Sequence, residues 1–97
     1  MFEIEFTIEA ERDLKWSRKS EPNEILDAID SQLRFEPTVE ARNRKRLRPN
    51  QTAEWEMRVG KFRVFYDADT TVRIIRIEAI GLKVGTKVFF RGKEKEL

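Results

Sequence analysis

The sequence predicts an α+β domain in which an N-terminal strand and a two-helix hairpin precede a twisted antiparallel sheet of about four strands. Apolar and polar residues alternate over residues 2–8 and again over residues 54–67, which is the pattern of half-buried strands. Between these stretches, apolar residues recur at helical spacing over residues 25–33. The 97 residues are enough for one small core, so a single domain spanning residues 1–97 is expected.

The lack of cysteine and histidine narrows the chemistry that this chain can perform. It has no disulfide and no thiolate metal site, and catalysis would have to use Arg, Lys, Tyr, Asp or Glu. We therefore expect no cofactor and no metal. The acidic N-terminus lacks the features of a signal peptide and no apolar run approaches membrane-spanning length, so we expect a cytoplasmic protein without membrane contact.

Charge is distributed unevenly along the chain. Residues 1–40 hold five basic and eleven acidic side chains, a net charge of −6, whereas residues 41–97 hold fifteen basic and seven acidic side chains, a net charge of +8. The two parts sum to the net charge of +2 of the whole chain. A basic C-terminal part favours an anionic partner, with nucleic acid as the first candidate.

The first strand leads directly into a first helix. Apolar residues at alternate positions from Phe2 to Ile8 predict a strand with one buried face. Thr7 is a suitable N-cap for a helix over residues 8–19. The candidate buried residues of this helix are Ala10, Leu14 and Trp16.

A second helix follows a break in the helical pattern. Ser20 or Glu21 can cap this helix, and Pro22 is tolerated in its first turn. The helix is predicted to continue to about Phe35, and Pro37 ends it. The two helices together are expected to cover the apolar face of the sheet. The apolar stripe of the second helix consists of Ile25, Leu26, Ile29 and Leu33.

The two strands within residues 54–67 are predicted to form a tight hairpin. Gly60 and Lys61 suit a type II′ turn, because glycine tolerates the positive φ of the first turn position. With this loop, Arg58 lies across from Arg63 on a charged face that also carries glutamates. The apolar face pairs Val59 with Phe62, Met57 with Val64 and Trp55 with Tyr66, and the glutamates of the charged face are Glu54 and Glu56.

A fourth strand is predicted over residues 71–80, after a two-residue loop at residues 69–70. In this register Arg76 falls opposite Arg63, so Arg58, Arg63 and Arg76 would form a row of guanidinium groups across three strands. On the apolar face Ile75 would fall opposite Val64 and Ile77 opposite Phe62, while Ile74 would fall opposite Phe65 on the charged face.

The C-terminal part is predicted to contain one more short strand. Gly81 and Gly85 are expected to bracket a flexible turn, and residues 87–91 have the composition of a strand. The polar tail from Gly92 onward is expected to stay unburied and mobile.

A dense basic stretch lies within residues 36–53, which are predicted to form an exposed loop with a short extended piece around Leu47. Five cations in seven positions favour contact with a nucleic-acid backbone, although basic loops are often only solvated. The arginine row likewise predicts either a phosphate-binding surface or a sheet surface neutralised by Glu56 and Glu78. Phe65 either stacks on a base or packs under the C-terminal segment. The five cations are Arg42, Arg44, Lys45, Arg46 and Arg48.

Metal-free RNA cleavage requires a base, positive charge at the phosphate and an acid. Glu54 or Glu56 is a candidate base. Tyr66, the only tyrosine, lies on the core face of the predicted hairpin, so the general acid is left unassigned. The positive charge can come from Arg63, Arg58 and Lys45.

Segments along nearly the whole chain resemble the RelE/ParE superfamily, the toxins of type II toxin–antitoxin systems. The hairpin WEMRVGKFRVFYD (55–67) is the most specific of these segments, and its likeness does not separate the subfamilies. The resemblance implies a RelE-like fold with the order of elements given above. The other similar segments are EAERDL (9–14), ILDAID (25–30), RKRLRPN (44–50) and IIRIEAIGLKVG (74–85).

The resemblance implies a toxin that a cognate antitoxin masks, and the ribonuclease members of the family cut messenger RNA on the ribosome and so inhibit translation. Arg63 matches the hairpin arginine that stabilises the transition state, and Lys83 lies near the position of another family arginine. Together with the chemistry above, this gives Arg63, Lys83, Glu56 and Lys45 as candidate catalytic residues, and Arg42, Arg44, Arg46, Arg48, Arg58, Arg76 and Phe65 as candidate RNA-binding residues.

Two other functions stay open, because this chain departs from the ribonuclease members of the family at Glu54, Glu56 and Phe89. The best-studied ribonucleases of the family carry lysines where this chain has Glu54 and Glu56, and a tyrosine near the position of Phe89. The ParE branch instead inhibits DNA gyrase, and that activity needs no ribonuclease site. A third possibility is a toxin-like module whose main remaining activity is binding its antitoxin.

Overall fold

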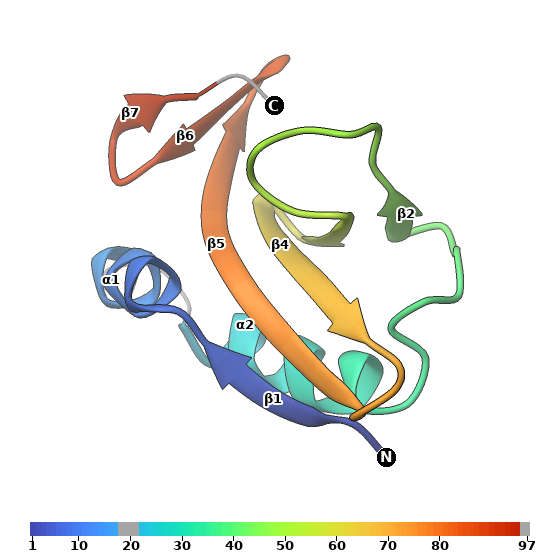
Figure 1. The fold of residues 1–97 in the computed structure, drawn as a ribbon. Helices are drawn as coiled ribbons and strands as arrows, with labels where there is room; N and C mark the ends of the chain where they lie inside the picture. The colour runs from blue at the N-terminus through green and yellow to red at the C-terminus, as the bar shows by residue number, and fades with distance from the viewer. Residues whose placement is uncertain (18–21, 96–97) are drawn as a thin grey trace.

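The computed structural model describes residues 1–17 and 22–95 and confirms the α+β class. The strand β1 comes first, two helices follow, and six further strands complete one sheet (Figure 1). The sheet has seven strands rather than about four. The elements are β1 (Glu3–Phe6), α1 (Ile8–Ser17), α2 (Pro22–Ala28), the π-helical segment η1 (Ile29–Leu33), β2 (Arg44–Arg46), β3 (Trp55–Val59), β4 (Phe62–Asp69), β5 (Ile74–Val84), β6 (Lys87–Phe90) and β7 (Lys93–Glu94).

The sheet places β2 to β7 side by side in sequence order. These neighbours pair antiparallel, and β1 pairs parallel with the first part of β5. The helices pack on one face, where Ile25, Ile29 and Leu33 join the side chains of β3, β4 and β5 in the main core. No helix in residues 1–17 or 22–95 is long and apolar enough to cross a membrane.

Helix α1 begins as predicted, but its apolar residues are less buried than expected. The Thr7 hydroxyl accepts a hydrogen bond from the Ala10 amide at 3.0 Å, which confirms the N-cap. Ala10 is fully buried and Leu14 is partly buried. Trp16 and Ile8 are 46% and 67% exposed, so their predicted burial is wrong. The predicted end of this helix and the caps at residues 20–21 lie outside the described residues.

The second helix changes its geometry part-way along. It begins as the α-helix α2 and continues as the π-helical turn η1, whereas a single regular helix was predicted. Ile25, Ile29 and Leu33 are buried as predicted, whereas Leu26 is 36% exposed. The buried Tyr66 hydroxyl donates to the Pro37 carbonyl oxygen at 2.6 Å and so ties the segment after η1 to the sheet.

The β3–β4 hairpin has the predicted register. All of the predicted pairs occur, including Arg58 opposite Arg63 on the charged face. Gly60 has a φ of 57°, as the first position of a II′ turn requires, and Lys61 is not among the residues with positive φ. The six apolar residues of the hairpin all lie in the main core.

The predicted pairing of β5 is wrong. The loop before it spans residues 70–73 rather than two residues, so Arg76 pairs with Asp67 instead of Arg63. A β-bulge also shifts the register between Phe65 and Tyr66 and leaves Glu78 as the extra residue. The pairs that replace the predicted ones are Tyr66–Ile77, Phe65–Ala79, Val64–Ile80, Arg63–Gly81 and Phe62–Leu82.

The end of the chain adds two strands to the sheet. Gly81 lies within β5 rather than in a turn, and a Cβ there would come within 2.6 Å of a Val88 methyl group. The strand β6 confirms the strand predicted over residues 87–91, although it ends at Phe90. The polar tail is exposed over residues 92–95, as predicted, and its strand β7 pairs with β6. The extended piece expected around Leu47 is β2, which ends one residue earlier and pairs with β3.

Replacing Tyr66 with Phe is expected to destabilise the fold, because it leaves the buried Pro37 carbonyl without its hydroxyl donor. Such a loss costs about 1–3 kcal/mol of unfolding free energy, which equilibrium urea unfolding would measure. Thr86→Val removes a hydroxyl group from an exposed turn and should change the free energy by less than ~0.5 kcal/mol. Equal destabilisation in the two variants would contradict this prediction.

Candidate functional site

A small basic cavity, here called the basic cradle, lies on the face of the sheet opposite the helices. Its volume is about 130 Å³, and its walls come from β2, β3, β4 and β5. The four candidate catalytic residues all line it, so the structure brings them together. Glu56 is the single carboxylate among the lining residues, which are Arg42, Asn43, Arg44, Lys45, Glu56, Arg58, Arg63 and Lys83.

Arg63 is the most buried of the candidate catalytic side chains, with 8% of its surface exposed. Its Nη1 group donates to the carbonyl oxygens of Gly60 at 3.0 Å and Phe62 at 2.8 Å, which holds the guanidinium against the hairpin turn. Burial lowers the pKa of Arg63, while Glu56 raises it and Arg58 lowers it further. Arginine nevertheless stays charged at neutral pH, so Arg63 provides a fixed positive charge.

Other cations of the basic cradle are exposed, among them Lys45, Arg58 and Lys83. Lys45 Nζ lies 3.5 Å from Glu56 Oε2, and this pair joins the neighbouring strands β2 and β3. Arg58 Nη2 donates to the Arg42 carbonyl oxygen at 2.8 Å, which holds the guanidinium group of this exposed side chain. Lys83 is exposed and reaches the basic cradle from β5. An anion entering the cavity would therefore meet exposed cations at the rim and the buried guanidinium of Arg63 below.

Two of the candidate RNA-binding residues are buried. Arg44 is 7% exposed and donates to Gln32 Oε1 at 2.7 Å and to the Val39 carbonyl oxygen at 3.1 Å. Arg44 also lines the cavity, and its hydrogen bonds connect β2 to η1 and to the segment that follows η1. Phe65 is fully buried against Phe90, with ring centroids 5.5 Å apart, so it packs under the C-terminal strands and offers no surface to a base.

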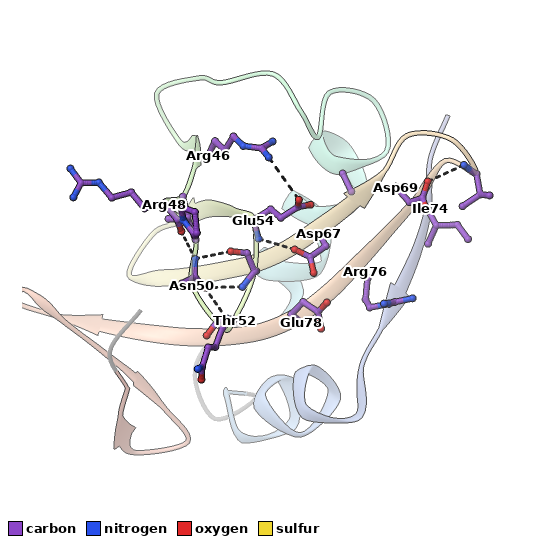
Figure 2. A pocket seen from close by; sticks show the side chains of 16 residues that line it. Arg46, Arg48, Asn50, Thr52, Glu54, Asp67, Asp69, Ile74, Arg76 and Glu78 are labelled. Atoms are coloured by element: carbon purple, nitrogen blue, oxygen red, sulfur yellow. Dashed lines mark hydrogen bonds and ion pairs between the residues drawn. The ribbon is translucent and has the colours of Figure 1, made fainter.

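Three further candidate RNA-binding residues, Arg46, Arg48 and Arg76, line a different and larger cavity, here called the mixed pocket. It has a volume of about 770 Å³ and lies between residues 46–54 and the end of β4 together with the first part of β5 (Figure 2). Asn50 holds the first of these segments together, since its Oδ1 accepts from the amides of Thr52 and Ala53. The charged residues of the mixed pocket are Arg46, Arg48, Arg76, Glu54, Asp67, Asp69 and Glu78.

The change in β5 register explains why Arg76 is in the mixed pocket. Asp67, its actual partner, lies four residues beyond Arg63 on β4, which is about 13 Å along the strand. Arg58, Arg63 and Arg76 therefore do not form one row. Arg46 is also neutralised in part, because its Nη2 lies 3.8 Å from Glu54 Oε2.

The mixed pocket contains a pair of carboxyl groups, Asp67 and Glu78, that was not predicted from the sequence. Burial, a hydrogen bond with Asp67 and the charge of Asp67 together raise the pKa of Glu78 to about 7, although Arg76 lowers it. The signal for this site was the β-bulge. The core residues Ile77 and Ile80 are three positions apart rather than two, which breaks the alternation at Glu78.

No family model matches this sequence, and no curated protein matches it either. Solved structures match across most of the chain. A chain of the RelBE2 toxin–antitoxin complex from Mycobacterium tuberculosis is 23% identical, with a TM-score of 0.72, and the match covers 84% of this chain and 98% of that chain.

Two further solved structures are similar. A chain of the YoeB–YefM complex from Staphylococcus aureus is 19% identical, with a TM-score of 0.64, over 87% of this chain and 99% of that one. A chain of the YoeB dimer from the same organism is 24% identical, with a TM-score of 0.52, over 78% and 90%. This chain has the RelE/YoeB-like fold.

On this RelE/YoeB-like fold, the basic cradle has the groups to bind a phosphodiester. Guanidinium groups can make paired hydrogen bonds to phosphate oxygens, and the carboxylate of Glu56 can accept a proton. Among the described residues, no group of three or more acidic side chains is placed to hold a metal ion. The carboxylate and cations that line the basic cradle can take part in acid–base chemistry assisted by fixed positive charge.

The stability of the fold should fall as pH rises from about 5 to about 8, because Glu78 titrates there. Its pKa of about 7 lies above the ordinary 4.5, so the folded chain holds a proton that the unfolded chain releases. This stabilisation is fully present below the unfolded pKa and is lost as pH rises through the folded pKa. In Glu78→Gln, the thermal midpoint should depend less on pH.

The control for this pH series is Glu11→Gln, which changes an exposed carboxylate on α1. Its thermal midpoint should follow the wild-type pH dependence. If Glu78→Gln kept the full wild-type slope between about pH 5 and pH 8, Glu78 would not carry the shifted titration.

Proposed function

We propose that this chain is the toxin of a type II toxin–antitoxin pair and that it cleaves messenger RNA on the ribosome without a metal ion. The observation that carries this proposal is the meeting of Arg63, Lys83, Glu56 and Lys45 in one cavity. These residues come from four strands. The RelE/YoeB-like fold supports the proposal, since the similar chains belong to toxin–antitoxin structures.

The charge of the basic cradle favours an RNA backbone over other ligands. Six of its eight lining residues are Arg or Lys. A phosphodiester that entered would be bound by exposed Arg58 and Lys83 and would approach the fixed guanidinium of Arg63. A cavity of about 130 Å³ accommodates a phosphate group rather than a whole nucleotide, so the bases would lie outside it.

The cleavage step assigns one task to each group. Glu56 takes the proton of the 2′-hydroxyl group, and the resulting oxygen attacks the adjacent phosphorus. Arg63 and Arg58 stabilise the charge that builds on the phosphate oxygens. The bond from phosphorus to the 5′-oxygen breaks, Lys83 gives that oxygen a proton, and a cyclic phosphate remains on the other fragment. Lys45 holds Glu56 in place through their 3.5 Å ion pair.

The test combines purified ribosomes, a translated message and the folded protein, with cleavage sites mapped by primer extension. Wild-type protein should give discrete cuts. Glu56→Gln should slow cleavage by ~10²–10⁴-fold and Arg63→Ala by ~10²–10³-fold, because they remove the base and the fixed charge. Lys15→Ala on α1 removes an exposed cation away from the cavity and should leave the rate unchanged.

Uncut message at high concentrations of folded wild-type protein would overturn the ribonuclease proposal. The same preparation can then be assayed on DNA gyrase, where loss of supercoiling would favour the gyrase-inhibitor alternative. Expression without growth arrest and without either activity would favour a module that mainly binds its antitoxin.

A further inference from the structure

Strand β5 has an unpaired stretch on one edge. Its first part pairs with β1 through Ile77, and its last part pairs with β6 from Leu82 onward. Residues 78–81 have no strand partner on that edge within the described chain. The β-bulge at Glu78 lies in this same stretch. Backbone groups of a buried strand need partners, so something other than a strand must supply them here.

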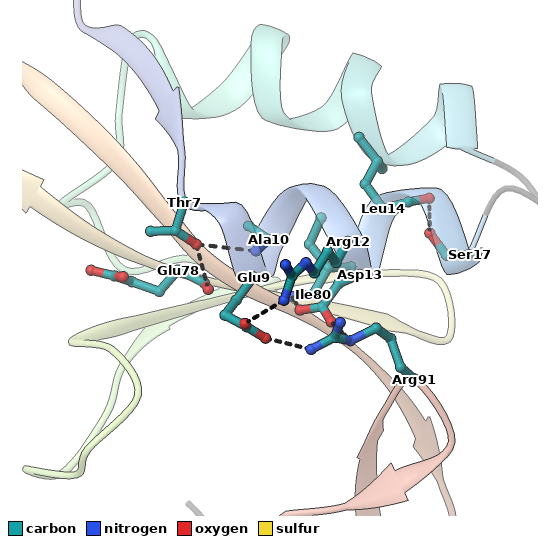
Figure 3. Close-up of polar contacts among 10 residues, drawn as sticks. All are labelled: Thr7, Glu9, Ala10, Arg12, Asp13, Leu14, Ser17, Glu78, Ile80 and Arg91. Carbon is teal, nitrogen blue, oxygen red and sulfur yellow. Dashed lines mark hydrogen bonds and ion pairs between the residues drawn. The ribbon is translucent and has the colours of Figure 1, made fainter.

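Partners come from two side chains, that of Thr7, the N-cap of α1, and that of Asp13 within α1 (Figure 3). The Thr7 hydroxyl donates to the Glu78 carbonyl oxygen at 3.0 Å. Asp13 Oδ2 accepts from the Ile80 amide at 2.9 Å. The first contact is made by the extra residue of the bulge itself, and the second lies two residues further along β5. Asp13 is only 3% exposed. A carboxylate this deeply buried is held in one position by its partners.

Arg91 fixes Asp13 from the other side. Its Nε lies 3.1 Å from Asp13 Oδ1, and its Nη2 pairs with Glu9. Burial raises the pKa of Asp13, while the Ile80 amide and Arg91 lower it. Arg91 lies in the turn between β6 and β7, so one carboxylate joins α1, β5 and the C-terminal strands.

The bulge decides which face of β5 is turned toward the basic cradle. Without the extra residue, the Tyr66–Ile77 pair would continue as Val64–Ala79, one position out of the observed register. A one-residue shift sends every later side chain to the opposite face. Lys83 would then point to the core, and the apolar side chains of Ile80 and Leu82 would point outward.

We propose that Asp13 is a positioning residue for the basic cradle: by accepting the Ile80 amide, it holds the bulge that turns Lys83 to the face of Arg63. Asp13 does not line the basic cradle and acts only through β5. The cleavage readout of this inference rests on the proposed function, whereas its hydrogen-exchange readout does not.

The experiment compares Asp13→Ala, which removes the acceptor, with Asp13→Asn, which keeps an oxygen for the Ile80 amide. The control is Ile29→Val or Ile29→Ala, whichever matches the urea midpoint of Asp13→Ala, since Ile29 is buried under the sheet away from the bulge. Amide hydrogen exchange and message cleavage are measured on all variants.

In Asp13→Ala, the Ile80 amide should exchange at least about tenfold faster than in the matched control, because its local opening no longer breaks a buried hydrogen bond. Message cleavage should also fall at least about tenfold below that control. Asp13→Asn should stay within a few-fold of wild type in both readouts. If Asp13→Ala does not fold, Asp13→Ser, whose shorter side chain does not reach the Ile80 amide, takes its place in the same comparison.

Two results would overturn the positioning role. One is Ile80 exchange and cleavage in Asp13→Ala that equal those of the matched control. The other is Asp13→Asn losing as much cleavage as Asp13→Ala while its Ile80 amide stays protected. If wild-type protein cuts no message, the proposed function fails, and Ile80 exchange alone still decides whether Asp13 holds the bulge.

Discussion

The burial of β4 on both faces is the constraint on which the rest of the structure depends. Phe62, Val64 and Tyr66 pack into the main core on one face. On the other face Phe65 packs with Phe90, while Arg63 is held by the carbonyl groups of the hairpin turn. A strand enclosed in this way has little freedom to move. A charge presented from it is therefore preorganised, which is what electrostatic stabilisation of a reacting phosphate requires.

Local sequence patterns predicted the β3–β4 register correctly and the β4–β5 register incorrectly. The β3–β4 register followed from alternation and from the glycine at position 60, because both act between neighbouring residues. The predicted β4–β5 register was wrong because the loop extends over residues 70–73, with Arg73 at a φ of 60°, which no apolar pattern indicates. The bulge was also missed, although the spacing of Ile77 and Ile80 carries its signal.

The sequence predicted which candidate catalytic residues come together, but it did not predict which basic residues lie outside this cavity. The four candidate catalytic residues do meet, since each lies on the charged face of its own strand. Arg44 and Phe65 are buried rather than part of an open surface, and Arg76 is exposed but lies in the mixed pocket, away from Arg63. Their partners, such as Gln32 for Arg44, come from segments distant in sequence, and periodicity carries no information about such contacts. The result is a compact basic cradle separate from a pocket in which opposite charges are mixed.

The measurement that tests this account most directly is the backbone pairing of β4 and β5 in solution, from interstrand nuclear Overhauser effects on the wild-type protein. Contacts of Tyr66 with Ile77 and of Val64 with Ile80 are expected in the same sample. These contacts place Lys83 on the face of Arg63. An uninterrupted ladder in which Val64 contacts Ala79 would turn Lys83 into the core and would contradict the basic cradle itself.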